Sequence, residues 1–314
     1  MTEAGPWRIV FFGSTSFSRP ALEALAAGPD QVVLVVSPPP APAGRGRQLR
    51  PSTVAALADQ LKLPSLAARS VRSLEVIGQI RAVAPDLLVV AAFGGFLPPA
   101  LLGLGRFPPV NIHPSLLPRH RGPAPVNWSL IRGDREVGVS LIFLEEEMDA
   151  GPILSQRSFP VKGESAGVWE ERLTLAGAED LLAVIAGLKA GTVCPRPQAA
   201  PATVNPLLRK EDGRVDFQRP AAELAGLING VDPWPGAQAR FKGRSLKLFG
   251  AAPADLPRPA QPGEVLGLEG GRLLVAAGQG ALALAELQPE GKKRLPAAEF
   301  QRGYRPERLE SCGN

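Results

Sequence analysis

The sequence predicts two domains: a Rossmann-like, mostly parallel α/β domain, followed by a smaller β-barrel domain of the OB-like type. Three observations predict this architecture. A chain of 314 residues is long enough to bury two hydrophobic cores. Its first part alternates buried strands with helices, and its last part consists of short apolar runs separated by glycine turns. We place the α/β domain at 1–190, a linker at 191–205 and the barrel domain at 206–314.

The chain opens as strand, helix and strand. Residues 8–12 form an apolar run that suits a strand buried on both faces. A helix of about ten residues follows and ends before Gly28, and residues 31–36 predict a second buried strand. The first turn holds one glycine, without a G-x-G-x-x-G or a P-loop pattern. A dinucleotide- or nucleoside-triphosphate-dependent enzyme is therefore disfavoured.

An arm rich in proline and glycine occupies residues 37–51 and carries Arg45, Arg47 and Arg50. No acidic residue lies between Asp30 and Asp59. Long loops within compact domains are usually functional or disordered. The arm is therefore either a solvated surface loop or a segment that contacts phosphates, since clustered arginines suit polyanions.

The next elements continue the alternation of helix and strand. Helical periodicity predicts helices at 52–62, with Ser52 as the N-cap, and at 73–83. Apolar runs predict strands near 63–66 and at 86–92. Glycines and aromatic residues follow at 93–98, where they form either a pocket for a flat ring or a packed turn.

The remaining elements complete the two domains. A strand ends at Pro114, a helix begins near Pro125, and two antiparallel strands are added at the side of the sheet before a long helix. The predicted ranges are 137–145 and 153–161 for these strands, 165–188 and 221–229 for helices, and 238–241, 245–249, 263–268, 272–276 and 281–287 for the barrel strands.

The candidate active site lies where the strand before Pro114 ends. The only two histidines of the chain, His113 and His120, lie in this stretch. Asn111 and His113 alternate along the strand, so their side chains share one face, at the edge where open parallel sheets bind ligands. Asp149 precedes Ala-Gly in a turn that could direct it toward the same place.

An amide, an imidazole and a carboxylate together suit direct acyl transfer between two nitrogens. An imidazolium and an amide N–H can stabilise an oxyanion, and a carboxylate can orient the ring and relay a proton. Taken singly, Asn111 and Asp149 are equally typical of turns, and His113 of a satisfied buried histidine. Neither cysteine is spaced with the histidines as metal ligands are, so no metal is expected.

Three segments together resemble the signature of folate-dependent formyltransferases: Asn-Ile-His-Pro-Ser-Leu-Leu-Pro at 111–118, Arg-His-Arg-Gly at 119–122 and Met-Asp-Ala-Gly at 148–151. The resemblance implies that Asn111, His113 and Asp149 are catalytic. It also implies contacts with tetrahydrofolate from Ser115, Leu116, Leu117 and Pro118.

The resemblance extends over nearly the whole chain, through segments at 8–14, 42–52, 214–217, 229–235 and 287–293. It implies transfer of the formyl group of 10-formyltetrahydrofolate to the free amino group of methionyl-initiator-tRNA, for translation initiation. It implies that the arm contacts the tRNA acceptor end through Arg45, beside Arg47 and Arg50. The arm departs from the family pattern in having Pro-Pro-Pro-Ala-Pro at 38–42 where an acidic-basic pair is common.

Two other functions stay open. A formyltransferase for a small amine, such as glycinamide ribonucleotide or an amino-sugar nucleotide, would share the trio without needing the arm. A non-catalytic RNA-binding protein could use the same scaffold. The net charge of +5 tilts toward acidic partners, though a solvated basic surface explains it equally. Two cysteines, no signal peptide and no long apolar run predict a cytoplasmic protein without membrane contact, and we expect a monomer.

Overall fold

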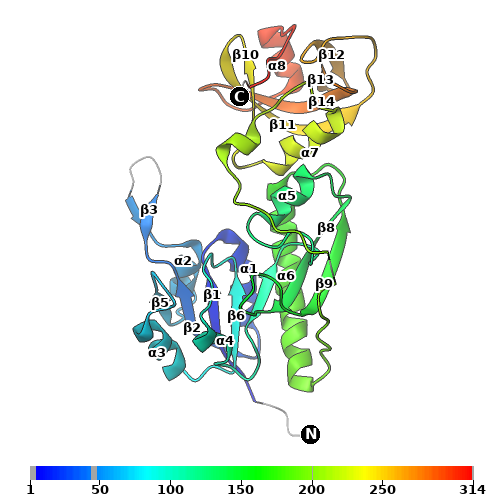
Figure 1. Cartoon of the computed structure of the whole chain (residues 1–314). Coiled ribbons are helices and arrows are strands. Elements are labelled where there is room, and N and C mark those ends of the chain that lie inside the picture. The colour runs from blue at the N-terminus through cyan, green and yellow to red at the C-terminus, as the bar shows by residue number, and fades with distance from the viewer. Residues whose placement is uncertain (1–4, 44–47, 200, 313–314) are drawn as a thin grey trace. The chain divides into compact units, whose positions relative to one another are not determined.

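The computed structural model describes residues 5–43, 48–199 and 201–312, which pack into two compact units (Figure 1). Each unit is assembled from separate pieces of the chain. The first contains Met1–Gly122, Gly138–Ser158 and Glu170–Val204, and the second contains Pro123–Val137, Phe159–Trp169 and Asn205–Asn314. The contiguous domain boundaries given above remain a prediction.

A seven-stranded sheet, in the order β5-β2-β1-β6-β7-β8-β9, forms the centre of the first unit. Its five parallel strands are β1 (Arg8–Gly13), β2 (Gln31–Ser37), β5 (Ser65–Ala67), β6 (Leu87–Ala91) and β7 (Val110–His113). Strand β8 (Glu136–Phe143) pairs antiparallel with β7, and β9 (Ile153–Pro160) lies at the edge. The predicted α/β fold with antiparallel strands at its side is confirmed.

Helices cover both faces of this sheet because its central strands are apolar on both sides. The helices are α1 (Arg19–Ala27), α2 (Thr53–Gln60), α3 (Leu74–Ala82), α4 (Pro99–Leu102) and α6 (Ala166–Ala190). A short 3₁₀ helix, η1 (Ser16–Ser18), precedes α1. Ile77 and Ile80 of α3 pack with Val10 and Val90 in one buried cluster. Gly177 of α6 leaves no room for a Cβ against Ile112, so the helix approaches β7 closely.

The arm, predicted as an irregular loop, contains a two-stranded hairpin. Strands β3 (Ala41–Ala43) and β4 (Gln48–Arg50) pair antiparallel, with Ala41 opposite Arg50. In Figure 1, β3 stands away from the seven-stranded sheet. The predicted cap is confirmed where the hairpin ends, because the Ser52 side chain accepts a hydrogen bond from Ala55 N at the start of α2.

The second unit is an antiparallel sheet closed by the end of the chain. Its strands follow the order β10-β11-β14-β13-β12, with β15 beside β14. Their bounds are Ala237–Phe241 (β10), Arg244–Ala254 (β11), Val265–Glu269 (β12), Arg272–Ala276 (β13), Ala281–Pro289 (β14) and Leu295–Pro296 (β15). Arg240 of β10 bridges Glu310, and Val265 N of β12 donates to Glu307 O. The C-terminal segment thus links both edge strands, which supports the predicted barrel.

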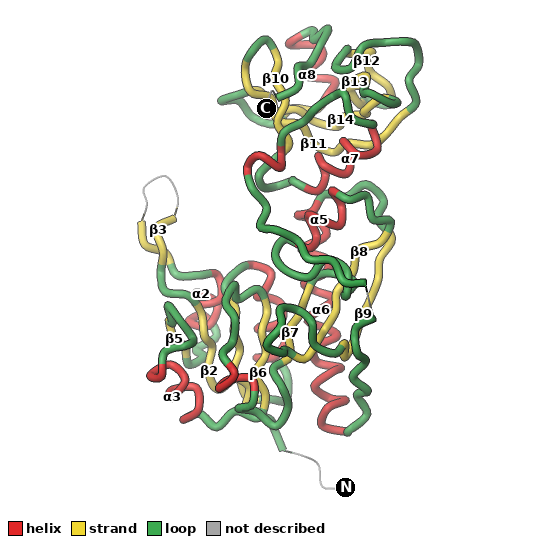
Figure 2. The backbone as a smooth tube through the Cα atoms, viewed as in Figure 1, coloured by secondary structure: helices red, strands yellow, loops and turns green. Residues whose placement is uncertain are grey.

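Helices α5 (Pro125–Ile131) and α7 (Ala221–Gly230) pack together in this unit and lie side by side in Figures 1 and 2. A Cβ at Gly226 would lie 2.5 Å from Leu130 O, and one at Gly230 would lie 2.9 Å from Asn127 O. The Asn127 side chain donates to Gly230 O at 2.7 Å. Neither the 3₁₀ helix η2 (Lys210–Gly213) nor the C-terminal helix α8 (Ala297–Tyr304), which buries Phe300, was predicted.

Within the described part of the chain, no helix combines the length and the apolar character needed to cross a membrane.

Candidate active site

Strand β7 presents Asn111 and His113 as predicted. The strand lies between β6 and β8, with Asn111 opposite Ile142 and His113 opposite Ser140. Both side chains are buried, although a central parallel strand usually carries apolar residues. Buried polar groups need hydrogen-bond partners, so the surroundings of these two side chains decide what they can do.

Asp149 reaches the end of β7 from a turn between β8 and β9. Its φ of 51° places it in the left-handed region, which side chains other than glycine seldom adopt. Two residues on, a Cβ at Gly151 would lie only 1.8 Å from Phe143 O, so the turn requires glycine there. The turn is therefore fixed at both ends, by the left-handed backbone of Asp149 and by the close approach at Gly151.

The structure brings the predicted trio together around the Asp149 carboxylate. Asp149 Oδ2 accepts from Gly122 N at 2.9 Å and lies 3.6 Å from His113 Nδ1. Its Oδ1 lies 3.5 Å from Asn111 Nδ2. The Gly122 contact is an ordinary hydrogen bond, whereas the other two are long, so the amide and the imidazole remain able to turn toward a substrate oxygen.

The His113 ring faces oxygen atoms on both sides. Its Nε2 lies 2.9 Å from the backbone oxygen of His120, and its Nδ1 faces Asp149. A carbonyl can only accept, so an Nε2 that hydrogen-bonds to it carries hydrogen. The arrangement therefore holds the ring between a carbonyl oxygen and a carboxylate.

The segment predicted to contact folate is anchored to β8 and β9. Ser115 and Leu117 are buried, whereas Leu116 and Pro118 are partly exposed. Ser140 Oγ of β8 donates to Ser115 O at 2.7 Å. Only the partly exposed side chains and the backbone of this segment are therefore available to a ligand.

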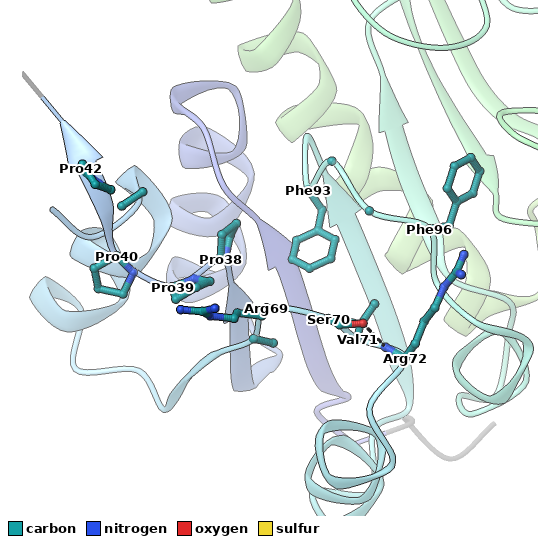
Figure 3. A pocket seen from close by; sticks show the side chains of 14 residues that line it. Pro38, Pro39, Pro40, Pro42, Arg69, Ser70, Val71, Arg72, Phe93 and Phe96 are labelled. Carbon is teal, nitrogen blue, oxygen red and sulfur yellow. Dashed lines mark hydrogen bonds between the residues drawn. The ribbon is translucent and has the colours of Figure 1, made fainter. Parts of the chain in front are cut away.

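A hollow of about 630 Å³ opens at the carboxyl ends of three parallel strands (Figure 3). Its lining comes from residues 38–42 after β2, 68–72 after β5 and 93–96 after β6. Phe93 packs edge-on against Phe12 with ring centroids 5.4 Å apart, whereas Phe96 is 55% exposed. The stretch at 93–98 thus combines a packed ring with a pocket wall, the two interpretations its sequence left open.

Two arginines give this hollow a basic rim. Arg69 and Arg72 are exposed, and in Figure 3 the Arg69 side chain extends toward the prolines and that of Arg72 toward Phe96. Aromatic walls with a few charged groups are typical of small-molecule sites.

Of the arginines predicted to contact tRNA, Arg45 and Arg47 lie outside the described residues. Arg50 lies in β4 and is exposed. Among the residues that the structure describes, no group of three or more His, Cys, Asp and Glu side chains is arranged to hold a metal ion.

Sequence reasoning missed the residues that support the trio. His120, the other histidine of the motif, contributes its backbone oxygen, and Gly122 contributes its N–H. Gln198, from the predicted linker, donates to the backbone oxygen of Asp149 at 2.7 Å. The Arg-His-Arg-Gly part of the motif could have indicated the first two, but nothing near Gln198 could have indicated the third.

Comparison with known proteins places this geometry in context. Residues 7–185 match the family described as formyl transferase, and residues 207–305 match the formyl transferase C-terminal domain. The chain is 43% identical over 295 residues to the methionyl-tRNA formyltransferase of Desulfotalea psychrophila, covering 93% of this chain and 91% of that protein. It is 40% identical over 302 residues to the methionyl-tRNA formyltransferase of Geobacter sulfurreducens, covering 96% and 95%.

A solved structure shares the fold at low identity. The N-formyltransferase from Helicobacter canadensis, in complex with folinic acid and dTDP-3-aminofucose, superposes with a TM-score of 0.66 at 14% identity. The match covers 90% of this chain and 99% of that one.

Proposed function

This chain belongs to the formyl transferase family, and from that premise we propose that it transfers the formyl group of 10-formyltetrahydrofolate to the free amino group of methionyl-initiator-tRNA. The product, formylmethionyl-tRNA, serves translation initiation. One observation carries the proposal: Asn111, His113 and Asp149 converge in a protein that is 43% identical to a methionyl-tRNA formyltransferase.

Asn111 and His113 act as hydrogen-bond donors at the reacting carbonyl. Negative charge develops on the formyl oxygen as the amine adds, and preorganised donors stabilise that charge best where water is excluded. Both side chains are buried, and the 3.5 Å contact between Asn111 Nδ2 and Asp149 Oδ1 is long enough to be exchanged for a substrate oxygen. An imidazolium donates more strongly than a neutral ring.

Asp149 orients the imidazolium and relays a proton. The attacking amine must lose a proton and the departing nitrogen must gain one, and a carboxylate near both can pass it, directly or through water. The hydrogen bond from Gly122 N holds the carboxylate in place while this happens.

The hollow beside β6 fits part of a folate. When bound, the folate supplies an activated formyl group. The walls formed by Phe93 and Phe96 suit a flat ring system, and Arg69 and Arg72 suit the carboxylates of a glutamyl tail. The anchored segment from Ser115 to Pro118 supplies further contacts through Leu116, Pro118 and the backbone.

The β3–β4 hairpin contacts the tRNA. Exposed Arg50, with Arg45 and Arg47 in the same arm, provides cations for phosphates. Cys194 and Cys312 are unpaired, as suits a reducing compartment, and we place the reaction in the cytoplasm. A monomer is the expected working state, which analytical ultracentrifugation measures.

The activity is tested by mixing the protein and 10-formyltetrahydrofolate with charged initiator tRNA, glycinamide ribonucleotide or an amino-sugar nucleotide. Mass spectrometry should find a formyl group on the methionyl amine of the tRNA and none on the small amines. Formylation of a small amine alone would replace the proposed substrate, and no formylation of any acceptor would remove the proposed activity.

A further inference from the structure

The turn that presents Asp149 is held by a ring of hydrogen bonds, of which the proposed mechanism uses only the one from Gly122 N. Gln198 Nε2 donates to Asp149 O at 2.7 Å and to Gly151 O at 2.8 Å. Gln198 Oε1 accepts from Arg121 Nε at 3.1 Å and from Arg121 Nη2 at 2.9 Å. The next backbone N–H, that of Gly122, donates to Asp149 Oδ2 and closes the ring.

We infer that Gln198 and Arg121 are positioning residues that fix the Asp149 carboxylate for the reaction, an inference that rests on the proposed function. The Gln198 amide has two hydrogens and one oxygen with two lone pairs, and all four hydrogen bonds are made within the ring. A fully satisfied polar network of this kind holds its members in one geometry.

The backbone of Asp149 explains why the turn needs such support. A non-glycine residue in the left-handed region persists only when its surroundings over-determine it. Gln198 Nε2 donates to the backbone carbonyls of both Asp149 and Gly151, so it fixes the turn on both sides of Ala150. Gly122 follows Arg121 directly in the chain. The hydrogen bonds that fix Arg121 therefore also fix the position of the Gly122 N–H, which binds the Asp149 carboxylate.

The segment that carries Gln198 is itself tied to both parts of the site. Arg196 exchanges backbone hydrogen bonds with Ile153, just after the Asp149 turn, at 2.8 and 2.9 Å. Thr203 Oγ1 accepts from His120 N at 2.8 Å, and His120 O in turn faces the His113 ring. The segment at 191–205, predicted as a linker, therefore supports both the Asp149 turn and the His120 loop of the candidate site.

The decisive variant is Gln198→Glu. Glutamate keeps the size of the side chain and still accepts from Arg121, but it cannot donate to the Asp149 and Gly151 carbonyls. We expect kcat to fall about tenfold to a hundredfold, by analogy with the loss of outer-shell partners behind metal ligands. The KM values for formyl folate and charged tRNA and the dissociation constant of tetrahydrofolate should stay close to wild type, because neither residue lines the hollow proposed for the folate.

Arg121→Lys and the double variant test whether the ring acts as a unit. Arg121→Lys loses the paired Nε and Nη2 donors and should lower kcat similarly. The double variant should be little worse than either single one, because contacts in one network are not additive. Exposed Gln60 at the end of α2 provides the control, since Gln60→Glu makes the same chemical change elsewhere in this unit.

Two results would overturn the inference: a wild-type kcat in Gln198→Glu, or a loss of kcat that merely follows equal losses of tetrahydrofolate binding and thermal stability. Multiplicative losses in the double variant would also count against it. An inactive wild-type protein would instead refute the proposed function, so the two failures are distinguishable.

Discussion

At the scale of single residues, the site depends on three polar side chains that sequence and structure bring together by different means. Asn111 and His113 share a face because they are two residues apart on one strand. Asp149, 38 residues after Asn111, joins them only because β8 pairs with β7 and a constrained turn follows.

Asp149→Asn should lower kcat about 10²- to 10⁴-fold, the usual contribution of a positioned acid–base group. Asparagine tolerates the left-handed backbone and keeps the size of the side chain, so folding should persist. Asn111→Ala should cost about 10²- to 10³-fold, as loss of one oxyanion donor does. Single-turnover rates of formyl transfer measure both effects.

Asp59, an exposed residue of α2, provides the control for these variants, and Asp59→Asn should turn over normally. Near-normal rates in Asp149→Asn or in Asn111→Ala would exclude the proposed roles. The sequence motif contains the trio and also His120 and Gly122, but it did not show what these two contribute, and nothing in it pointed to Gln198. His120 and Gly122 act through backbone atoms, which residue type does not reveal.

At the scale of elements, the arm shows what composition predicts and what it leaves open. Its proline content suggested an irregular loop, yet Ala41 to Ala43 pairs with Gln48 to Arg50 in a hairpin. Proline is tolerated there because the hairpin has only two strands and both are edges.

Arg50→Ala should raise KM for charged tRNA severalfold while KM for formyl folate stays unchanged. Loss of one phosphate contact should also reduce the slope of log K against log salt by about 1. Binding titrations at several salt concentrations measure this slope. Exposed Arg81 at the end of α3 provides the control, since Arg81→Ala removes the same charge elsewhere and should leave the slope unaltered. An equal rise in KM for charged tRNA and for formyl folate would mean that the hairpin does not act on tRNA.

At the scale of the whole molecule, stability should depend on pH through Asp232 and Arg294 of the second unit. Burial raises the pKa of Asp232, and Arg294, 3.8 Å away, opposes that rise. Arg294 also pairs with Glu286 and lies over the Phe249 ring. When the pKa of an acid is higher in the folded state than in the unfolded state, the free energy of unfolding falls as the pH rises through the two values.

Arg294→Met should therefore raise the folded pKa of Asp232 further and destabilise the protein more at neutral pH than in acid. The substitution also removes the pairing with Glu286, so the destabilisation at pH 7, where both carboxylates are charged, should exceed that at about pH 4. Denaturant unfolding at the two pH values measures it. Lys293→Met, next to it and exposed, should show no such difference. A loss for Arg294→Met that is equal at both pH values would assign its role to packing alone.

The periodicity of the sequence does not predict which segments belong to which unit. Helix α5 and residues 159–169 fall within the predicted first domain, 1–190, yet both belong to the second unit. Gly226 and Gly230 make this possible, because their missing side chains let α7 approach α5 closely. The apolar pattern of α5 shows that it needs a buried partner, but not which one.

Local periodicity predicts the alternation of strands and helices and the antiparallel C-terminal domain, and a dense motif predicts the candidate trio. The meeting of the Asp149 turn, the His120 loop and the segment around Gln198 at one place is visible only in the folded chain. These partners are joined by hydrogen bonds between segments that are distant in the sequence. Many of the atoms involved are backbone groups, which every residue possesses.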